Sequence, residues 1–300
     1  MSERVVRGEG VGIWTEAFGD PGRPAVLLMM GSYYQGIAWP EEFCTRIAAA
    51  GRYVIRYDHR DVGQSSIFDY EQGPYTLLDM ARDAIVLLGE YGIGAAHLVG
   101  ASMGGMIAQE VALSFPERVL SLTSFMSTPL AKSFTDGSAA PELPGPTPAA
   151  WKAFETVPLA GSRMSREERI EGWTQFQRAV SGKLVPFDEE GQRRLQARFL
   201  DRARDLDAMW NHLAATAASP DRTDRLASLD VPTLVIHGTL DPVVPIAHGH
   251  ATAAAIPGAG LLVIEGLGHE YDPRALEPVA DAIVRHTGST REVAIGSSET

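Results

Sequence analysis

The sequence is poor in cysteine. Its 300 residues include a single one, Cys44. One cysteine excludes an intramolecular disulfide, and a chain without disulfides is typical of a reducing compartment. Cys44 lies in the apolar-periodic segment EEFCTRIAA, where we interpret it as a small core residue rather than a nucleophile. The sequence therefore predicts a cytoplasmic protein.

Long apolar runs and an excess of basic charge are also missing. No run approaches the about 18 apolar residues of a membrane-spanning helix, and the first residues lack the apolar core of a signal peptide. The 26 Lys and Arg residues stand against 38 Asp and Glu residues, a net charge of −12. An acidic chain repels phosphate backbones and anionic lipid, so we expect neither nucleic acid nor a membrane as partner. Neither a metal-ligand cluster nor a dinucleotide fingerprint occurs in the sequence, so no cofactor and no metal are expected.

Short apolar runs alternate with segments of helical periodicity. The apolar runs are continuous, as in strands that are covered on both faces. Strands are expected at 25–30, 53–57, 97–100, 122–126, 232–238 and 260–266, and helices at about 41–50, 76–91, 103–114 and 275–286. This alternation predicts an α/β fold with a mostly parallel central sheet and helices on both faces.

The alternation stops after residue 126. Segment 137–150 holds four prolines within eight residues, which excludes regular structure there. The following residues contain a capping box, Ser165 to Glu168, and apolar positions at helical spacing. We therefore predict an inserted helical cap at 127–225. The core is expected to consist of 1–126 and 226–288, followed by a flexible tail at 289–300.

Five aromatic residues are candidates for a substrate pocket. Three of the five tryptophans, Trp151, Trp173 and Trp210, fall in the predicted cap. Aromatic side chains there can line a cavity, although packing of the cap itself is their more common role. Tyr33 and Tyr34 follow the strand expected at 25–30. Their side chains could face the substrate pocket or pack as ordinary wall residues, and the sequence favours neither role.

Segment 97–113, HLVGASMGGMIAQEVAL, places a serine between glycines where an expected strand meets an expected helix. The pattern Gly100-x-Ser102-x-Gly104 is that of a nucleophile elbow, a sharp turn that exposes the serine beside the first amides of the helix. Bulky neighbours would collide with the strand and the helix. We predict Ser102 as nucleophile and the Met103 N–H as an oxyanion donor. The alternative is a packing turn with an idle serine.

A serine nucleophile needs a base, and in this architecture an acid and then a histidine follow it along the chain. Of the eight histidines, His269 fits best, because it lies in the glycine-bracketed loop GLGHEY directly after an expected strand. Asp241, in the turn HGTLDPVVP, is the acid that would orient the imidazole. Glu265 and Glu270 are too close to His269 in sequence to be preferred for this role.

The second oxyanion donor is expected in the loop GSYYQG, which follows the strand at 25–30. Gly31 permits an unusual backbone angle and Ser32 comes next, so we predict the Ser32 N–H as this donor. The polar turn 58–65, DHRDVGQS, is expected to brace the loop by local hydrogen bonds, with direct contact to substrate as the alternative.

Together these motifs resemble the α/β-hydrolase superfamily over nearly all of residues 1–290. The stretches VLLMMGS, YDHRDVGQS, GASMGG, PTLVIHGTLDPVVP and GLGH occur in the family's order and spacing. The opening residues, AWP and RYDHRD are most similar to aclacinomycin methylesterase-like hydrolases, which act in antibiotic biosynthesis on a carboxymethyl ester of a glycosylated polyketide. The resemblance implies the α/β-hydrolase fold and a serine hydrolase that cleaves a carboxylic ester, with a methyl ester as the leading substrate, through an acyl-enzyme. In many relatives His-Gly stands where this chain has Met30-Gly31.

Three other functions would use the same residues. The same triad can hydrolyse lactones or C–C bonds. It can also support perhydrolysis, since Ser-Met-Gly-Gly occurs in haloperoxidase-like relatives. A ligand-binding scaffold would keep the fold without catalysis, but the complete set of Ser102, Asp241 and His269 argues against it. The expected partner is a small-molecule ester, and the sequence predicts neither its acyl group nor the oligomeric state.

Overall fold

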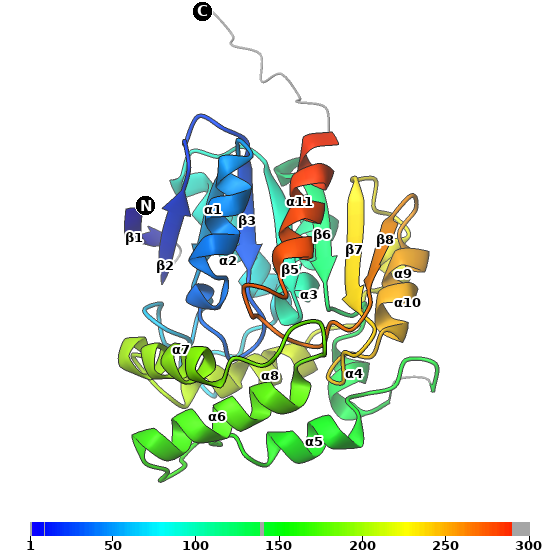
Figure 1. Cartoon of the computed structure of the whole chain (residues 1–300). Coiled ribbons are helices and arrows are strands. Elements are labelled where there is room, and N and C mark those ends of the chain that lie inside the picture. The colour runs from blue at the N-terminus through cyan, green and yellow to red at the C-terminus, as the bar shows by residue number, and fades with distance from the viewer. Residues whose placement is uncertain (1, 9, 139–140, 290–300) are drawn as a thin grey trace, which may run out of the picture.

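The computed structural model describes residues 2–8, 10–138 and 141–289. At its centre lies an eight-stranded sheet in the order β1-β2-β4-β3-β5-β6-β7-β8 (Figure 1). Its pairs are parallel except for β1 with β2 and β2 with β4. The strands are β1 (Ser2–Gly8), β2 (Val11–Phe18), β3 (Ala25–Met29), β4 (Tyr53–Tyr57), β5 (Ala96–Ala101), β6 (Val119–Phe125), β7 (Thr233–Gly238) and β8 (Gly260–Ile264). The predicted mostly parallel sheet is confirmed.

Strands β1 and β2 were not predicted, because neither has a continuous apolar run. All eight residues of β2 are buried, including Glu16. The register places Glu16 opposite Arg56 of β4, and the Arg56 guanidinium donates two hydrogen bonds to its Oε2. This buried ion pair compensates the charge of Glu16, which interrupts the apolar pattern of β2 in the sequence.

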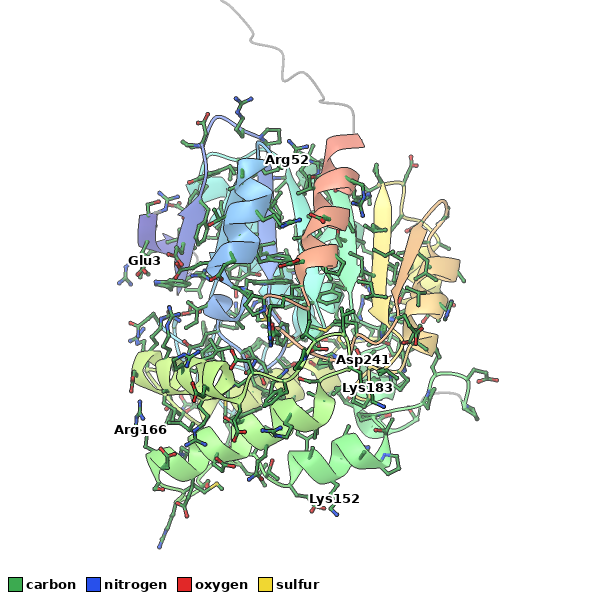
Figure 2. The ribbon with its side chains drawn as sticks, in the orientation of Figure 1. Glu3, Arg52, Lys152, Arg166, Lys183 and Asp241 are labelled. Carbon is green, nitrogen blue, oxygen red and sulfur yellow. The ribbon has the colours of Figure 1, made fainter. Side chains whose placement is uncertain are left out.

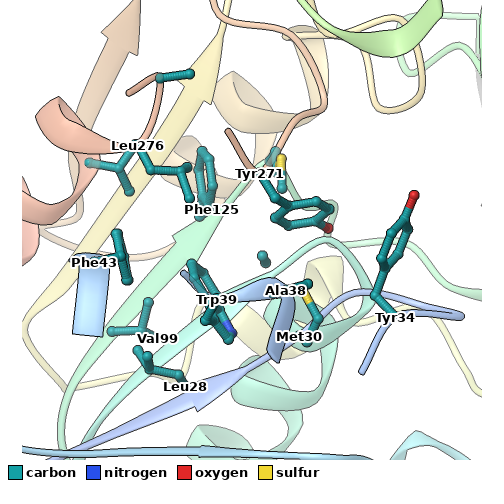
Figure 3. Packing of buried hydrophobic residues seen from close by; sticks show 14 of the residues in the cluster. Leu28, Met30, Tyr34, Ala38, Trp39, Phe43, Val99, Phe125, Tyr271 and Leu276 are labelled. Carbon is teal, nitrogen blue, oxygen red and sulfur yellow. The ribbon is translucent and has the colours of Figure 1, made fainter. Parts of the chain in front are cut away.

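Helices cover both faces of the sheet. Helices α1 (Glu41–Ala49) and α11 (Glu277–Ser289) cover one face, and α2 (Leu77–Glu90), α3 (Met103–Ser114) and α10 (Ala247–Ala255) cover the other (Figure 1). Alternate residues of β3 serve the two faces, as the pleat requires. Leu28 joins the first core, part of which Figure 3 shows around Phe43, whereas Leu27 joins the second.

A layer of helices lies beneath the carboxyl ends of the parallel strands (Figure 1). We call α4 (Lys132–Asp136), α5 (Pro148–Phe154), α6 (Arg166–Val180), α7 (Glu189–Arg202) and α8 (Asn211–Ala217) the helical layer. The capping box at the start of α6 forms as expected. Helix α5 starts at Pro148, inside the segment predicted to be irregular. A proline is accepted there because its fixed φ suits the first helical position.

Four short elements complete the part of the chain that the structure describes: η1 (Gly36–Ala38), η2 (Pro116–Arg118), η3 (Ala208–Trp210) and α9 (Thr223–Leu226). Helix α9 spans residue 225, where the cap was expected to end, and packs against α3 and α10 rather than joining the helical layer. The buried guanidinium of Arg222, directly before α9, donates to Gln109 Oε1 of α3. This bond anchors the short helix to the sheet side of the molecule.

No helix within the described ranges is long and apolar enough to cross a membrane. Of the tail expected at 289–300, Ser289 is the last residue of α11, and 290–300 lie outside the described residues.

Candidate active site

Three of the predicted site residues follow strands at the same edge of the sheet. Ser102 follows β5, Asp241 follows β7 and His269 follows β8, and Figure 2 shows Asp241 where the sheet meets the helical layer. The carboxyl edge of a parallel sheet is where ligands usually bind in such folds. Ser102 and His269 line one cavity of about 330 Å³. The Nδ1 atom of His269 lies 2.8 Å from Oδ2 of Asp241.

The turn at Ser102 has the geometry that the glycine pattern predicts. Ser102 has φ 55° and ψ −122°, in the left-handed half of φ space that non-glycine residues rarely occupy. Its N–H donates to Phe125 O of β6 at 2.9 Å, which holds the turn against the sheet. A Cβ atom at Gly100 would lie 2.1 Å from Gly104 O, and one at Gly104 would lie 2.1 Å from Met29 O. Strand, turn and helix can approach this closely only without side chains.

The Asp241 carboxylate is buried and held on both oxygens. Its Oδ1 accepts the backbone N–H groups of Val243 at 2.9 Å and Val244 at 2.8 Å, while Oδ2 accepts from His269. Because an ionised carboxylate only accepts hydrogen bonds, Nδ1 of His269 carries a proton, which leaves the Nε2 lone pair for another partner. His237 Nε2 donates to Val244 O at 2.7 Å, which fixes the turn from its other side.

Within the described residues, the Ser102 hydroxyl makes no direct hydrogen bond to the imidazole. Hydrogen bonds between a nucleophile and its base are commonly long before substrate arrives and shorten in the Michaelis complex. Ser32 and Met103, the residues with the two predicted oxyanion amides, line the same cavity as Ser102. The cavity is therefore lined by the predicted nucleophile, by the imidazole of His269 and by the two residues whose amides are the predicted oxyanion donors.

The expectation of an unusual backbone angle at Gly31 is wrong, since its φ lies outside the left-handed region that Tyr33 occupies instead, with φ 71°. The glycine at 31 instead suits a crowded position. A Cβ atom there would lie 2.7 Å from the Tyr271 hydroxyl and 3.1 Å from Ser102 Cβ. Figure 3 shows Tyr271 and Tyr34 beside this loop.

The polar turn 58–65 braces this loop, as predicted. Asp58 Oδ1 accepts the Gly36 N–H at 2.7 Å, and His59 Nε2 donates to Met30 O at 2.9 Å. Burial lowers the pKa of His59 to about 3, so its ring is neutral at physiological pH. The two bonds fix both ends of the loop after β3.

Four of the five aromatic candidates line the cavity: Tyr33, Tyr34, Trp151 and Trp210. Trp173 does not. Its ring is buried behind Tyr33 and Tyr34, with centroids 6.2 and 5.8 Å away, and it borders a smaller neighbouring pocket. Phe176, three residues further along α6, faces the cavity in its place.

Sequence reasoning missed many of the lining residues. Val243, Val244 and Tyr271 follow Asp241 and His269 within motifs already recognised, so their position in sequence could have indicated them. The helical layer and the segments that flank its helices contribute side chains without a recognisable pattern: Phe134, Thr135, Pro146, Phe154, Leu159, Phe176, Gln177, Leu213 and Thr216, and α3 adds Met106. Among the described residues that line this cavity, none is Asp, Glu, Lys or Arg.

Helix α6 also holds the loop that carries His269. The His269 N–H donates to Val180 O at 2.8 Å, and Gln177 Nε2 donates to His269 O at 3.2 Å. Gln177 Oε1 in turn accepts from the Tyr34 hydroxyl at 2.8 Å. The buried Glu270 carboxylate, whose pKa burial raises, accepts two backbone N–H groups in the same region. The helical layer thus touches the backbone of the imidazole-bearing loop.

Comparison with known proteins agrees with this geometry. A family model for the alpha/beta hydrolase fold matches residues 22–271. The chain belongs to the α/β-hydrolase fold family. This α/β-hydrolase also superposes on the crystal structure of the esterase RhEst1 from Rhodococcus sp. ECU1013 with a TM-score of 0.76, at 21% identity, over 97% of this chain and 100% of the other.

Two curated relatives are similar over nearly their whole length. The α/β-hydrolase is 36% identical to the rhodomycin D methylesterase DauP of Streptomyces sp. (strain C5), over 96% of this chain and 98% of the relative. It is 35% identical to the rhodomycin D methylesterase DnrP of Streptomyces peucetius, with the same coverage. At this identity and coverage the chain is a carboxylic ester hydrolase.

Proposed function

We propose that this protein hydrolyses the methyl ester of a bulky, polycyclic aromatic carboxylic acid of the polyketide type. Ser102 is the nucleophile, His269 the general base and acid, and Asp241 the residue that orients the imidazole. The observation that carries the proposal is the apolar cavity that Ser102 and His269 both line, with His269 Nδ1 hydrogen-bonded to Asp241 Oδ2 at 2.8 Å.

The first half-reaction forms an acyl-enzyme. Ser102 Oγ attacks the ester carbonyl carbon while His269 Nε2 takes the hydroxyl proton. The carbonyl π electrons move to oxygen, and the Ser32 and Met103 N–H groups stabilise the resulting oxyanion. Collapse of the tetrahedral intermediate breaks the C–OCH₃ bond, and His269 gives its proton to the departing methoxide, which leaves as methanol.

The second half-reaction releases the acid. A water molecule gives a proton to His269 and attacks the acyl carbon, and a second oxyanion forms at the same amides. Its collapse breaks the bond to Ser102 Oγ, which regains the proton from His269. Asp241 remains ionised throughout and stabilises the imidazolium that forms twice in each cycle.

The cavity supports an aromatic, uncharged acyl group. Aromatic rings from six segments of the described chain line it, among them Tyr33, Phe154 and Trp210. Burying a charged substituent without a partner is costly, and no charged residue type lines this space within the described ranges. The two relatives are named as methylesterases of rhodomycin D, which supports a methyl ester as the bond that is cleaved. We assign the selection of substrate to the helical layer, which lies within the segment 127–225 that was predicted as a cap.

The same lining favours release of the product. Hydrolysis converts a neutral ester into a carboxylate, and no Lys or Arg residue among the described lining residues would hold that charge. An unpaired carboxylate is unfavourable in an apolar cavity, so the product is expelled as it forms. The small-molecule ester partner is part of this proposal, and the cytoplasmic location expected from the sequence stays a prediction.

The experiment measures methanol release from methyl esters of polycyclic aromatic acids, with p-nitrophenyl acetate as a small reference ester. We expect Ser102→Ala to lower kcat by on the order of 10⁴–10⁶ without loss of folding, and to abolish labelling by a fluorophosphonate. A Ser102→Ala enzyme with unimpaired kcat would end the scheme. Turnover of lactones or peroxide-dependent halogenation, without methanol release from any methyl ester, would instead favour the alternative reactions.

A further inference from the structure

Two buried imidazoles contact the backbone of the loop that follows β3, one on each side of Ser32. His59 Nε2 donates to Met30 O at 2.9 Å, and the Tyr33 N–H donates to His212 Nδ1 at 3.2 Å. His59 follows β4 on the sheet side, whereas His212 belongs to α8 of the helical layer. Both side chains are buried. The amide proposed as second oxyanion donor therefore lies between two bonds to histidine, one from each part of the molecule.

The hydrogen bonds of His212 define its protonation. Its Nε2 lies 2.8 Å from Arg60 O, and because a carbonyl only accepts, Nε2 carries the proton. Nδ1 then has a free lone pair, which accepts the Tyr33 N–H. Burial lowers the pKa of His212 and so favours the neutral ring that this arrangement requires.

The segment that His212 holds is strained. Tyr33 has φ 71°, a conformation that a bulky side chain adopts only when its surroundings impose it. The last residue of η3, Trp210, and the first two residues of α8 supply those surroundings. The Trp210 ring lies 4.8 Å from the Tyr33 ring between centroids, His212 takes the N–H, and Asn211 Nδ2 donates to Asp61 Oδ2 at 3.0 Å. Three consecutive residues thus tie this end of the helical layer to the sheet side.

We propose that His212 is a positioning residue for catalysis, which fixes the backbone at Tyr33 so that the preceding Ser32 N–H points at the developing oxyanion. The inference rests on the proposed function, because it assigns that amide a role in ester hydrolysis. His212 acts through Tyr33, and it is absent from the described residues that line the cavity. The helical layer therefore completes the oxyanion hole as well as enclosing the substrate.

A pair of variants separates the two bonds of His212. In His212→Asn, the side-chain Oδ1 stands where Nδ1 was, so it still accepts the Tyr33 N–H but loses Arg60 O. In His212→Gln, the side-chain Nε2 still reaches Arg60 O, whereas the acceptor for Tyr33 is lost. Each variant removes one hydrogen bond of similar strength, so the pair is matched for stability and differs in the bond under test.

We expect His212→Gln to lower kcat about 10- to 100-fold on methyl esters and on p-nitrophenyl acetate, below the full loss of an oxyanion donor. KM should change less than about 2-fold, because the cavity wall is kept. His212→Asn should retain kcat within about 3-fold of the wild type, at a Tm close to that of His212→Gln.

A second readout compares two inhibitors built on one acyl group. A trifluoromethyl ketone forms a hemiketal with Ser102 and places an oxyanion against the amides, whereas the matching N-methyl amide binds without one. His212→Gln should weaken the ketone by the same factor as kcat/KM and leave the amide nearly unchanged. A purely structural role would weaken both inhibitors together.

Equal kcat losses in the two variants, or a larger loss in His212→Asn, would overturn the proposal. So would a His212→Gln protein that fails to fold while His212→Asn folds, since the Tyr33 bond would then be structural. The proposed function fails separately, if the wild type releases no methanol from any methyl ester. In that case p-nitrophenyl acetate still measures the difference between the two variants.

Discussion

The two sides of the site are built differently. On the sheet side, the proposed catalytic residues Ser102, Asp241 and His269 lie in the turns and loops that follow β5, β7 and β8. On the helical side, α6 and α8 contact the site through the backbone of its loops, by way of Gln177 and His212. Under the proposed function, the sheet supplies the reactive groups and the helical layer aligns the loops that carry them.

The strongest way to break this comparison is to disturb the sheet side. Gly104→Ala places a Cβ atom 2.1 Å from Met29 O and 2.6 Å from Met30 O, both backbone atoms that cannot move without shifting β3. We expect a loss of about 3 kcal/mol or more in the free energy of unfolding, and loss of ester turnover in whatever protein folds. Urea denaturation and p-nitrophenyl acetate assays measure the two effects.

Gly89→Ala is the matched control, because Gly89 also lies in a helix but has open space around its Cβ position. We expect this substitution to stabilise α2 by up to about 1 kcal/mol, as an exposed helical glycine allows. Equal stability of Gly104→Ala and Gly89→Ala would show that the close approach at the elbow is not required.

The residues proposed as the reactive half of the site could be predicted from sequence because the constraints on them are local. The glycines around Ser102, and the strand followed by a turn at Asp241 and His269, are requirements that neighbouring residues must meet. The order of the parallel strands then places their ends together. Strands β1 and β2 were not predicted because neither has a continuous apolar run, and in β2 the buried charge of Glu16 interrupts the apolar pattern.

The helical half could not be predicted in the same way. His212 and Tyr33 are 179 positions apart, and no pattern in either segment indicates that one accepts a hydrogen bond from the other. Gln177 and Trp173 lie on one helix near the same tyrosines, yet the first faces the cavity and the second lies behind them. Such choices depend on the angle at which α6 meets the sheet, which tertiary packing decides.

A second prediction uses acid pH to compare the parts of the molecule. Burial lowers the pKa of His59 to about 3 and of His97 to about 4, and it also lowers the pKa of His212, His237 and His248. The unfolded chain, with histidine pKa values near 6.5, binds more protons than the folded one below that pH. The stability that these neutral, buried histidines contribute is therefore fully present above about pH 6.5, and it is lost as the pH drops toward 4.

The contribution of His59 can be isolated with His59→Gln, whose Nε2 keeps the donor for Met30 O and does not titrate. Between pH 7 and pH 4.5, the free energy of unfolding of the wild type should fall by about 2–3 kcal/mol because of this one ring. The variant should lack that part of the pH dependence. Asp58 and Glu270, whose pKa values burial raises, oppose the trend only partly. If the free energy of unfolding fell equally in the two proteins between pH 7 and 4.5, the assignment of a neutral, buried His59 would be contradicted.

The smallest effect is expected where the helical layer touches the imidazole loop. Gln177→Ala removes the donor to His269 O and leaves the Tyr34 hydroxyl without its acceptor, both in buried surroundings. Losing these bonds should cost about 1–3 kcal/mol of stability, and the looser loop should lower kcat by about 3- to 10-fold. Gln175→Ala is the control on the same helix, since the exposed side chain of Gln175 bonds, among the described residues, to Glu171 alone. This substitution should change neither quantity. Stopped-flow measurement of acyl-enzyme formation distinguishes the cause. If the imidazole loop is what Gln177 aligns, acylation and deacylation slow together, because both use His269. If Gln177 instead shapes the substrate cavity alone, KM rises for polycyclic esters and the small p-nitrophenyl acetate is turned over as before, which would limit the aligning role of the helical layer to the oxyanion side.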